Sequence, residues 1–326
     1  MSTVVGRLAP SPTGLLHLGH ACSFLMAWWS ARSQGGRLLL RMEDLDGERC
    51  RPEFAAAILR DLEWLGLDWD GPVQLQSECA EAHAAALDSL RAAGLCYPCV
   101  CTRREIREAA SAPQAAAPRK HAEDVSQVYP GTCRRRFPGE AAALQAYGRE
   151  AYGREAAWRL RVPPGSITFE DGLYGPQAFA PAAEVGDFPI ARRGGAAAYQ
   201  LAVVVDDAAA GVTEVLRGRD LLPSTARQIL LQQHLGLPSP SWTHLPLVLD
   251  EAGQRLAKRS GALSLKALRA AGTDPRAVVS WVARVAGRAA PPAAPLLPAL
   301  LRPEELLPVF TALRPRPRDV PAPRQF

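Results

Sequence analysis

Apolar and polar positions near the N-terminus follow an order that predicts a strand, a turn and a helix. An apolar run at residues 4–5 is followed by a turn over residues 10–14, and a helix begins near His17. The glycines at 35–36 then turn the chain into a second apolar strand over residues 37–41. This order predicts a βαβ unit, in which ligand groups gather at the strand ends.

Later hydrophobic runs predict further elements. Residues 158–162 alternate between apolar and polar positions, as in a strand, and residues 245–249 form another hydrophobic stretch. Residues 203–205 are a continuous β-branched run, which predicts a buried parallel strand. We therefore expect Tyr199 and Arg217, which flank this run, to lie near strand ends, where a guanidinium could bind a substrate carboxylate through two hydrogen bonds.

Composition agrees with an enzyme of more than one folding unit. The chain has 326 residues, 48% of them hydrophobic, and a formal net charge of +5. This mild positive charge permits a polyanionic partner such as RNA without requiring one. Charges interrupt the longest apolar stretches before they reach the length of a bilayer, and no signal region opens the chain. We therefore expect a cytoplasmic protein with no membrane role.

The helix that begins near His17 is a candidate phosphate site, because backbone N–H groups at a helix start lack partners and carry partial positive charge. His17 and His20 could hydrogen-bond the α-phosphate of ATP as it becomes five-coordinate, and Gly19 would let adenine lie against the backbone. A pair of histidines three positions apart is by itself more typical of a helix surface or a core. The turn before the helix favours the functional interpretation.

Three carboxylates, those of Glu43, Asp44 and Asp46, follow the second predicted strand. An acidic triplet without such a neighbourhood is usually a solvated loop. Here it lies at a strand end, where a βαβ unit gathers its ligand groups. We therefore predict that Glu43 binds a substrate ammonium group.

Lysine is rare in this chain, which uses arginine for nearly all of its 38 basic residues. Lys258 lies in a basic, glycine-flanked loop shortly after residues 245–249. An ammonium group on a loop suits point-charge contact with the β- and γ-phosphates of ATP better than a planar guanidinium does. A solvated turn is the simpler interpretation of such a loop, and its position after the first motif favours the catalytic one.

Seven cysteines in a cytosolic chain are not expected to form disulfides. Cys99, Cys101 and Cys133 could supply most of a tetrahedral zinc site, with an intervening loop between the second and the third. His121 is available as a fourth ligand, but its segment has a solvated composition. The alternative is that these cysteines are buried as small hydrophobic side chains, as we expect for the other four.

Three segments carry no assigned chemistry. Residues 109–118 are rich in Ala and Pro and predict a flexible excursion, and residues 291–326 are rich in Pro and Arg and predict a partly disordered tail. Residues 146–150 recur as residues 151–155, which indicates a local duplication rather than a repeat architecture.

Together, these motifs resemble a known enzyme family. The segments at residues 7–20 and 41–46, the Lys258 loop and residues 187–222 occur in the order of class I glutamyl-tRNA synthetases and their shortened relatives, the glutamyl-queuosine tRNA(Asp) synthetases. The resemblance covers about residues 4–262. It implies an α/β fold, with a Rossmann-type parallel-sheet catalytic domain, an inserted zinc-bearing subdomain and a short helical C-terminal part.

The resemblance also implies domain boundaries. The first half of the catalytic domain spans residues 1–95, the zinc-binding subdomain 96–165, the second half 166–235, the signature loop with a helical stem-contact region 236–290, and the tail 291–326. Only residues 261–326 follow the signature loop, which is too short for the anticodon-binding domain of a conventional glutamyl-tRNA synthetase. We therefore expect that domain to be missing.

Roles for individual residues follow from the same resemblance. Glutamate would be bound by Arg7, Ser11, Glu43, Tyr199 and Arg217. ATP would be bound by Pro12, Gly14, His17, Gly19, His20 and Lys258, with His17, His20 and Lys258 as the catalytic residues. Lys258 matches the second lysine of the family's Lys-Met-Ser-Lys-Ser signature, in which Arg255 and Ala257 depart from the pattern. Zinc would be held by Cys99, Cys101, Tyr129 and Cys133.

The implied activity has two steps: glutamate reacts with ATP, accompanied by Mg²⁺, to form glutamyl-adenylate, and the glutamyl group then passes to queuosine in the anticodon of tRNA(Asp). The expected partners are ATP, L-glutamate and that tRNA, and we expect a monomer. Three alternatives stay open. They are a truncated synthetase that charges tRNA(Glu), an inactive paralogue that binds RNA or a protein, and, ranked last, a small-molecule nucleotidyltransferase.

Overall fold

The computed structural model describes residues 3–110, 128–136, 156–251, 253, 256, 264–286, 302–304 and 319–323. Its first sheet is parallel and consists of β1 (Val5–Leu8), β2 (Arg37–Met42) and β3 (Gln74–Leu75), in that spatial order. Helix α1 (Leu18–Ser33) connects β1 to β2, with Val5 opposite Arg37. The predicted βαβ unit is therefore confirmed.

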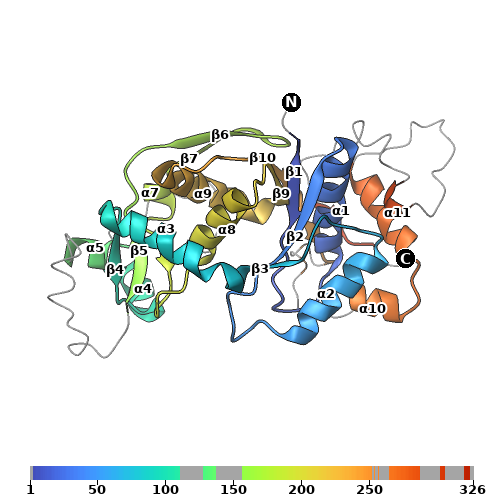
Figure 1. Cartoon of the computed structure of the whole chain (residues 1–326), viewed down its shortest axis with the longest axis horizontal. Coiled ribbons are helices and arrows are strands. Elements are labelled where there is room, and N and C mark those ends of the chain that lie inside the picture. Colours follow the sequence, from blue (N-terminus) through green and yellow to red (C-terminus); the bar gives the residue numbers. More distant parts are fainter. Residues whose placement is uncertain are drawn as a thin grey trace.

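A second sheet continues the first across a short junction. The backbone N–H of Thr213 donates to the carbonyl of Val5 at 2.9 Å, next to β9 (Glu214–Gly218). Strands β9, β10 (Ser241–Leu245) and β6 (Ile167–Asp171) are parallel neighbours, and β7 (Gly175–Phe179) pairs antiparallel with β6. Parallel strands that are far apart in the sequence thus end at the same edge of the two adjoining sheets (Figure 1).

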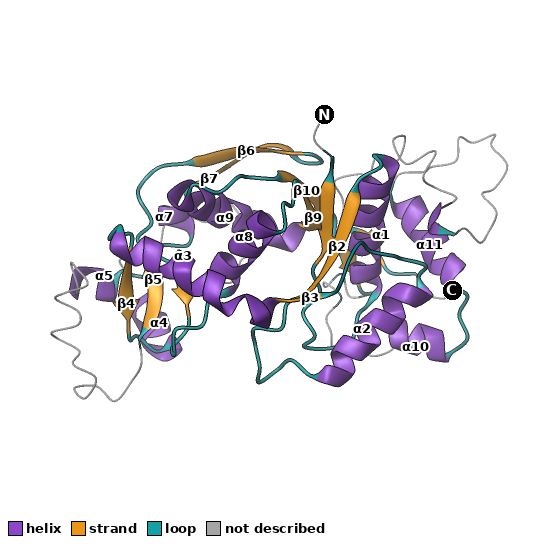
Figure 2. Cartoon of the chain, viewed as in Figure 1, coloured by secondary structure: helices purple, strands orange, loops and turns teal. Residues whose placement is uncertain are grey.

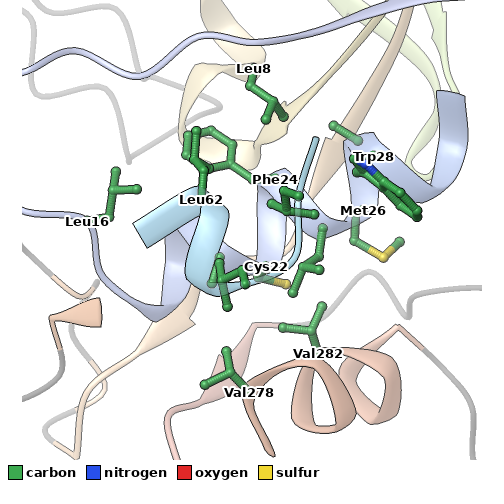
Figure 3. Close-up of a cluster of buried hydrophobic side chains, with 14 of the residues drawn as sticks. Leu8, Leu16, Cys22, Phe24, Met26, Trp28, Leu62, Val278 and Val282 are labelled. Carbon is green, nitrogen blue, oxygen red and sulfur yellow. The ribbon is translucent and has the colours of Figure 1, made fainter. Parts of the chain in front are cut away.

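Helix α1 lies at the centre of the largest core. Eleven of its 16 residues are buried, as expected for a helix that is apolar on most sides. It packs among β1, α2 (Pro52–Trp64), α10 (Leu265–Ala270) and α11 (Pro275–Val285). Figure 3 shows side chains of α1 (Cys22, Phe24, Met26, Trp28) between those of β1, α2 and α11 (Leu8, Leu62, Val278, Val282). This packing fixes the start of α1 against the sheet.

A smaller region at one end of the molecule carries the three cysteines predicted to bind metal (Figures 1 and 2). Its antiparallel sheet has the order β4 (Cys96–Cys99), β5 (Ala157–Leu160) and β8 (Pro189–Ala191). Short helices α4 (Arg103–Ala110), α5 (Thr132–Arg136) and α7 (Pro181–Glu184) accompany it, and α3 (Ala80–Ala92) follows the short 3₁₀ helix η1 (Gln76–Cys79). The strand predicted over residues 158–162 is confirmed as β5, shifted by one to two residues.

The strand predicted over residues 203–205 is wrong, because these residues belong to helix α8 (Tyr199–Ala209). Their side chains are all buried, since α8 packs against α3, α9 (Leu222–Leu235) and β8. A short apolar run fits a buried helix as well as a buried strand, and tertiary packing here overrides β-branched propensity. Tyr199 therefore opens a helix, whereas Arg217 does lie near the end of strand β9.

Part of the predicted tail is ordered. Strand β12 (Val320–Pro321) pairs in parallel with β11 (Val248–Leu249), and Asp319 accepts a hydrogen bond from the backbone N–H of Leu247 at 2.8 Å. The short 3₁₀ helix η2 (Arg219–Leu221) lies nearby, where Arg219 pairs with Asp319 at 2.8 Å. Residues 319–321 of the tail therefore pack against the segment that follows β10.

Several sequence predictions fall outside the described residues. These are most of the excursion at 109–118, of which residues 109–110 end α4, the duplication at 146–155, His121, Lys258 and most of the tail. Within the part of the chain that the structure describes, no helix is both long enough and apolar enough to cross a membrane.

Candidate active site and metal centre

A pocket of about 310 Å³ opens at the carboxyl ends of β1, β2, β9 and β10, next to the start of α1. Eight of the predicted site residues line it: Arg7, Ser11, His17, Gly19, His20, Glu43, Tyr199 and Arg217. Pro12 and Gly14 are buried in the turn that leads to α1 and do not line the pocket. The structure thus gathers the candidate nucleotide and amino-acid residues around one cavity, apart from Pro12 and Gly14, which lie in the turn beside it, and Lys258.

His17 and His20 hold the first turn of α1. His17 is the N-cap, and its Nδ1 accepts a hydrogen bond from the backbone N–H of Gly19 at 3.1 Å. His20 Nδ1 accepts from the backbone N–H of His17 at 3.1 Å. Because each Nδ1 accepts a hydrogen bond, the neutral rings carry their proton on Nε2. Each histidine can therefore cap the helix and donate a hydrogen bond to a phosphate oxygen.

Gly19 is required by the position of the His17 ring. A Cβ atom at residue 19 would lie 3.0 Å from Cε1 and 3.1 Å from Nδ1 of that ring. These distances are closer than side chains normally pack, so a substitution would displace the capping histidine. Glycine at this position therefore has a role in the protein itself, besides the predicted contact with adenine.

Glu43 follows β2 and is buried in the pocket wall beside Arg41. Its Oε1 lies 3.3 Å from Arg41 Nη2, and its backbone N–H donates to the carbonyl of Pro10 at 2.9 Å. Burial raises the pKa of the Glu43 carboxyl, and the charges of Arg41 and Arg7 oppose this shift. A ligand ammonium group would add a further positive charge that favours the ionised carboxylate.

The pocket rests on a buried ion pair that the sequence analysis did not identify. Arg41 Nη1 lies 2.7 Å from Asp207 Oδ1, and Arg7 Nε lies 3.5 Å from the same oxygen. Asp206, the neighbour of Asp207, accepts one hydrogen bond from Gln76 and pairs with His83, each at 2.7 Å. An aspartate pair next to three valines was the available signal, since buried carboxylates need cationic or hydrogen-bonding partners.

Arg217 is held by several neighbours in the opposite wall. Its Nη2 donates to Thr225 Oγ1 at 2.8 Å and to the carbonyl of Leu221 at 3.3 Å, and its Nε donates to His244 Nε2 at 3.1 Å. Burial lowers the pKa of Arg217, although a guanidinium stays protonated at neutral pH. Burial also raises the pKa of Tyr199, which keeps that phenol neutral in the pocket. Thr225 and His244 were not found from the sequence.

The three cysteines predicted to bind metal form one cluster at the end of β4. The Sγ atoms of Cys99, Cys101 and Cys133 all lie within 4.8 Å of one another. Tyr129 Oη lies 3.4 Å from Cys99 Sγ and 3.6 Å from Cys101 Sγ, and the Cys101 and Cys133 sulfurs are 3.4 Å apart. The four predicted ligands are therefore together.

This geometry fits a tetrahedral metal. With Zn–S bonds of about 2.3 Å and Zn–O bonds of about 2.0 Å, ligand atoms around zinc stand roughly 3.5 to 3.8 Å apart, close to the separations in the cluster. Arg159 Nε also donates to Cys99 Sγ at 3.2 Å. Hydrogen bonds from Cys101 and Cys133 lower the pKa of Cys99, and Arg159 assists. A thiolate is the form in which cysteine binds metals.

Gly186 brings Tyr129 to the cluster. Its φ is +71°, and a Cβ atom there would lie 2.8 Å from the carbonyl oxygen of Tyr129. The backbone N–H of Tyr129 donates to the carbonyl of Val185 at 3.1 Å, which fixes this close approach. The Tyr129 hydroxyl in turn accepts from the backbone N–H of Cys133 at 2.9 Å. The tyrosine is thus oriented by backbone groups.

Comparison with known proteins identifies the class. Residues 3–291 match the model of the family described as tRNA synthetases class I (E and Q), catalytic domain, and the chain belongs to this family. It is similar to the Glutamyl-Q tRNA(Asp) synthetase of Nitratidesulfovibrio vulgaris, with 48% identity over 86% of this chain and 86% of the relative. The protein of the same name from Symbiobacterium thermophilum is 48% identical over 97% of this chain and 96% of the relative.

Solved structures share the fold. A glutamate tRNA ligase from Elizabethkingia meningosepticum, crystallised in complex with its amino acid, matches with a TM-score of 0.80 and 24% identity, over 98% of this chain and 67% of that one. A glutamate-tRNA synthetase from Elizabethkingia anophelis matches with a TM-score of 0.82 and 23% identity, over 99% and 68%. The predicted fold class, an α/β synthetase catalytic domain with a parallel sheet, is therefore confirmed.

Proposed function

We propose that this chain activates L-glutamate with ATP and transfers it to queuosine in the anticodon of tRNA(Asp). The observation that carries the proposal is that the capped start of α1, Glu43 and Arg217 line the same pocket. Similarity over most of the chain to proteins named Glutamyl-Q tRNA(Asp) synthetase supports the choice of acceptor. Family membership argues against the small-molecule nucleotidyltransferase.

In the first step, a carboxylate oxygen of glutamate attacks the α-phosphorus of ATP, the bond to the β-phosphate breaks, and pyrophosphate leaves. Glu43 binds the glutamate ammonium, and Arg217 binds a carboxylate, with Arg7, Ser11 and Tyr199 completing the contacts. Glu43 and Arg217 are both buried in the pocket wall, where charged hydrogen bonds are stronger than in water. Their part is to orient the attacking carboxylate.

The start of α1 stabilises the charge that develops on the phosphates. His17 and His20 donate from Nε2, and the dipole of α1 adds partial positive charge at this end of the helix. Pro12 and Gly14 shape the turn before the helix, Gly19 leaves room for adenine, and Lys258 contacts the β- and γ-phosphates. Mg²⁺ accompanies ATP and offsets part of its negative charge.

In the second step, a hydroxyl of the queuosine ring attacks the glutamyl carbonyl carbon. A new ester bond forms, the bond between the carbonyl carbon and the phosphate oxygen breaks, AMP leaves with that electron pair, and the hydroxyl proton passes to the leaving phosphate. The catalytic contribution here is again positioning, because the adenylate is already a reactive acyl donor.

The cysteine cluster is proposed to hold one structural zinc ion through Cys99, Cys101, Tyr129 and Cys133. Four protein ligands would close the coordination sphere, which is typical of structural rather than catalytic zinc. Such an ion would link β4 to the segment that carries Tyr129 and α5. We further propose a monomer that works in the cytoplasm, where tRNA is found.

The test is transfer of radiolabelled glutamate, with ATP, to three separately purified tRNAs: tRNA(Asp) with queuosine, tRNA(Asp) without it, and tRNA(Glu). Labelling of the queuosine-bearing tRNA(Asp) alone is the expected result. Labelling of tRNA(Glu) instead would make the chain a truncated translation synthetase. No labelling of any tRNA, with no adenylate formed, would favour the inactive paralogue.

A further inference from the structure

Three buried side chains from neighbouring strands are joined by hydrogen bonds into a series that ends at the pocket. Asp171 is the last residue of β6, His244 is near the end of β10, and Arg217 is near the end of β9. His244 and Arg217 are direct partners in the parallel register. Their exposed fractions are 2% for Asp171, 0% for His244 and 5% for Arg217, so water does not compete for their hydrogen bonds.

Backbone groups orient the Asp171 carboxylate that contacts His244. Its Oδ1 accepts hydrogen bonds from the backbone N–H groups of Leu173 at 3.0 Å and Tyr174 at 2.9 Å. Its Oδ2 lies 2.6 Å from His244 Nδ1 and 3.2 Å from the backbone nitrogen of His244. The carboxylate therefore has one orientation, set mainly by backbone groups.

The tautomer of His244 follows from its two neighbours. A guanidinium only donates, so Nε2 must accept from Arg217 and the ring proton must be on Nδ1, facing Asp171. Burial and the charge of Arg217 lower the pKa of His244 to about 4, although Asp171 opposes the shift. Neutral His244 is the form that can accept from Arg217, and Asp171 selects its tautomer.

These contacts leave one end of Arg217 for a ligand. Nε is held by His244, and Nη2 is held by Thr225 and by the carbonyl of Leu221. Nη1 is buried and has no hydrogen-bond partner among the described residues, and Arg217 lines the pocket. An unpaired buried donor is costly, so the arrangement is suited to a group that arrives with a negative charge.

We propose that Asp171 and His244 are positioning residues, which hold the Arg217 guanidinium in the plane needed to bind a carboxylate of glutamate. This inference rests on the proposed function, since it assigns glutamate as the ligand of Arg217. Asp171 acts on substrate only through His244, and His244 acts only through Arg217. The family match does not by itself assign a role to either residue.

Asp171→Asn is the sharpest variant, because it changes the tautomer with almost no change in shape. The new amide would donate to His244 Nδ1, which moves the ring proton to Nε2 and sets it against the N–H of Arg217. His244→Leu is the second variant and removes the acceptor altogether. Asp61→Asn is the matched control, since Asp61 is also buried and paired with an arginine, at 3.2 Å from Arg269, but does not line the pocket.

The measurement is calorimetric titration of the full chain and its variants with L-glutamate and, separately, with ATP, together with thermal unfolding. We expect Asp171→Asn and His244→Leu to weaken glutamate binding roughly 10- to 100-fold, the usual size of a lost charged hydrogen bond. The ATP affinity of these two variants should stay within about 2-fold of the wild-type value. The control Asp61→Asn should keep both its glutamate affinity and its ATP affinity within the same range. Glutamine, which lacks one carboxylate charge, serves as a second ligand to measure loss of discrimination.

The outcomes separate the two proposals. Wild-type protein that binds ATP but no glutamate would overturn the proposed function and the positioning role with it. Wild-type protein that binds glutamate, with unchanged glutamate affinity in a folded Asp171→Asn variant, would overturn only the positioning role. Equal weakening of glutamate and ATP, together with a lower melting temperature, would also overturn it, since that pattern indicates a purely structural part. If His244→Leu does not fold, Asp171→Asn decides the matter.

Discussion

Arg41 Nη1 lies 2.7 Å from Asp207 Oδ1, and both side chains are buried beneath the pocket. Arg41 also contacts Glu43, so the ion pair between β2 and α8 sets the charge around the predicted ammonium site. Burial by itself would raise the pKa of Asp207, but Arg41 and Arg7 hold it below its ordinary value. The carboxylate is therefore ionised in the folded protein, and it balances two arginines.

Removal of one partner should strongly destabilise the fold. Asp207→Ala leaves Arg41 as a buried charge with less compensation, and we expect the free energy of unfolding to fall by about 3–5 kcal/mol. Urea denaturation followed by circular dichroism measures this. Asp88→Ala is the control, because Asp88 pairs with Arg91 at 2.7 Å on the surface and should cost about 0–1 kcal/mol. Similar small losses for both variants would contradict the structural role of Asp207.

The same pair predicts a dependence of stability on pH. The pKa of Asp207 is lowered in the folded state, so its stabilising contribution is full above the unfolded value of about 3.9. It is lost as the pH falls from that value through the lower folded pKa. The stability difference between wild type and Asp207→Asn should therefore be constant from neutral pH to about pH 5 and shrink below about pH 4. A difference that shrinks already near neutral pH would be inconsistent with a lowered pKa.

Glu43→Gln tests the ammonium site. The amide keeps the shape of the side chain but removes its charge, so glutamate affinity should fall roughly 10- to 100-fold. Because burial raises the pKa of Glu43, glutamate binding to the wild type should weaken on acidification at a higher pH than an exposed carboxyl would give. Calorimetric titration at several pH values measures both effects. Glu53→Gln, on the exposed start of α2, should leave glutamate affinity unchanged, and an equal loss there would refute the assignment.

The cysteine cluster predicts a stoichiometry. Metal analysis of purified wild type should give about one zinc ion per chain, from four converging ligands. Cys101→Ser should lower the zinc content well below one, because a hydroxyl is a poor substitute for a thiolate. Cys79→Ser should retain the metal, since Cys79 lies in η1, outside the cluster. A metal-free wild type that is fully folded would rule out a structural zinc ion.

The sequence predicted the features that depend on residues close together in the chain. The βαβ unit and the position of Glu43 at a strand end follow from turn residues and apolar runs close together in the chain. The strand predicted over residues 203–205 failed, because a three-residue apolar run does not distinguish a buried helix from a buried strand. Burial on all sides of α8, which only the assembled fold provides, decided the conformation there.

The hydrogen-bond and ion-pair partners of the site residues could not be predicted from the sequence. Arg41 and Asp207 are 166 positions apart, and Asp171 and His244 are 73 apart. No spacing rule joins residues at such separations. The first pair joins strand β2 to helix α8, and the second joins the ends of strands β6 and β10, so only the assembled fold places them together. The clustered cysteines could be predicted because two of them are close in sequence and cysteine chemistry is distinctive, whereas Tyr129 came from the family resemblance alone.

Lys258 lies outside the described residues, so its role stays a prediction from the sequence. We expect Lys258→Ala to lower glutamate-dependent exchange of pyrophosphate into ATP by roughly one to three orders of magnitude, the usual effect of a lost charge-stabilising group. Lys266→Ala is the matched control, since Lys266 is an exposed lysine on α10, close to Lys258 in the sequence, and should leave exchange unchanged. If the two variants exchange pyrophosphate equally well, Lys258 does not contact the migrating charge, and the phosphates depend on the start of α1 alone.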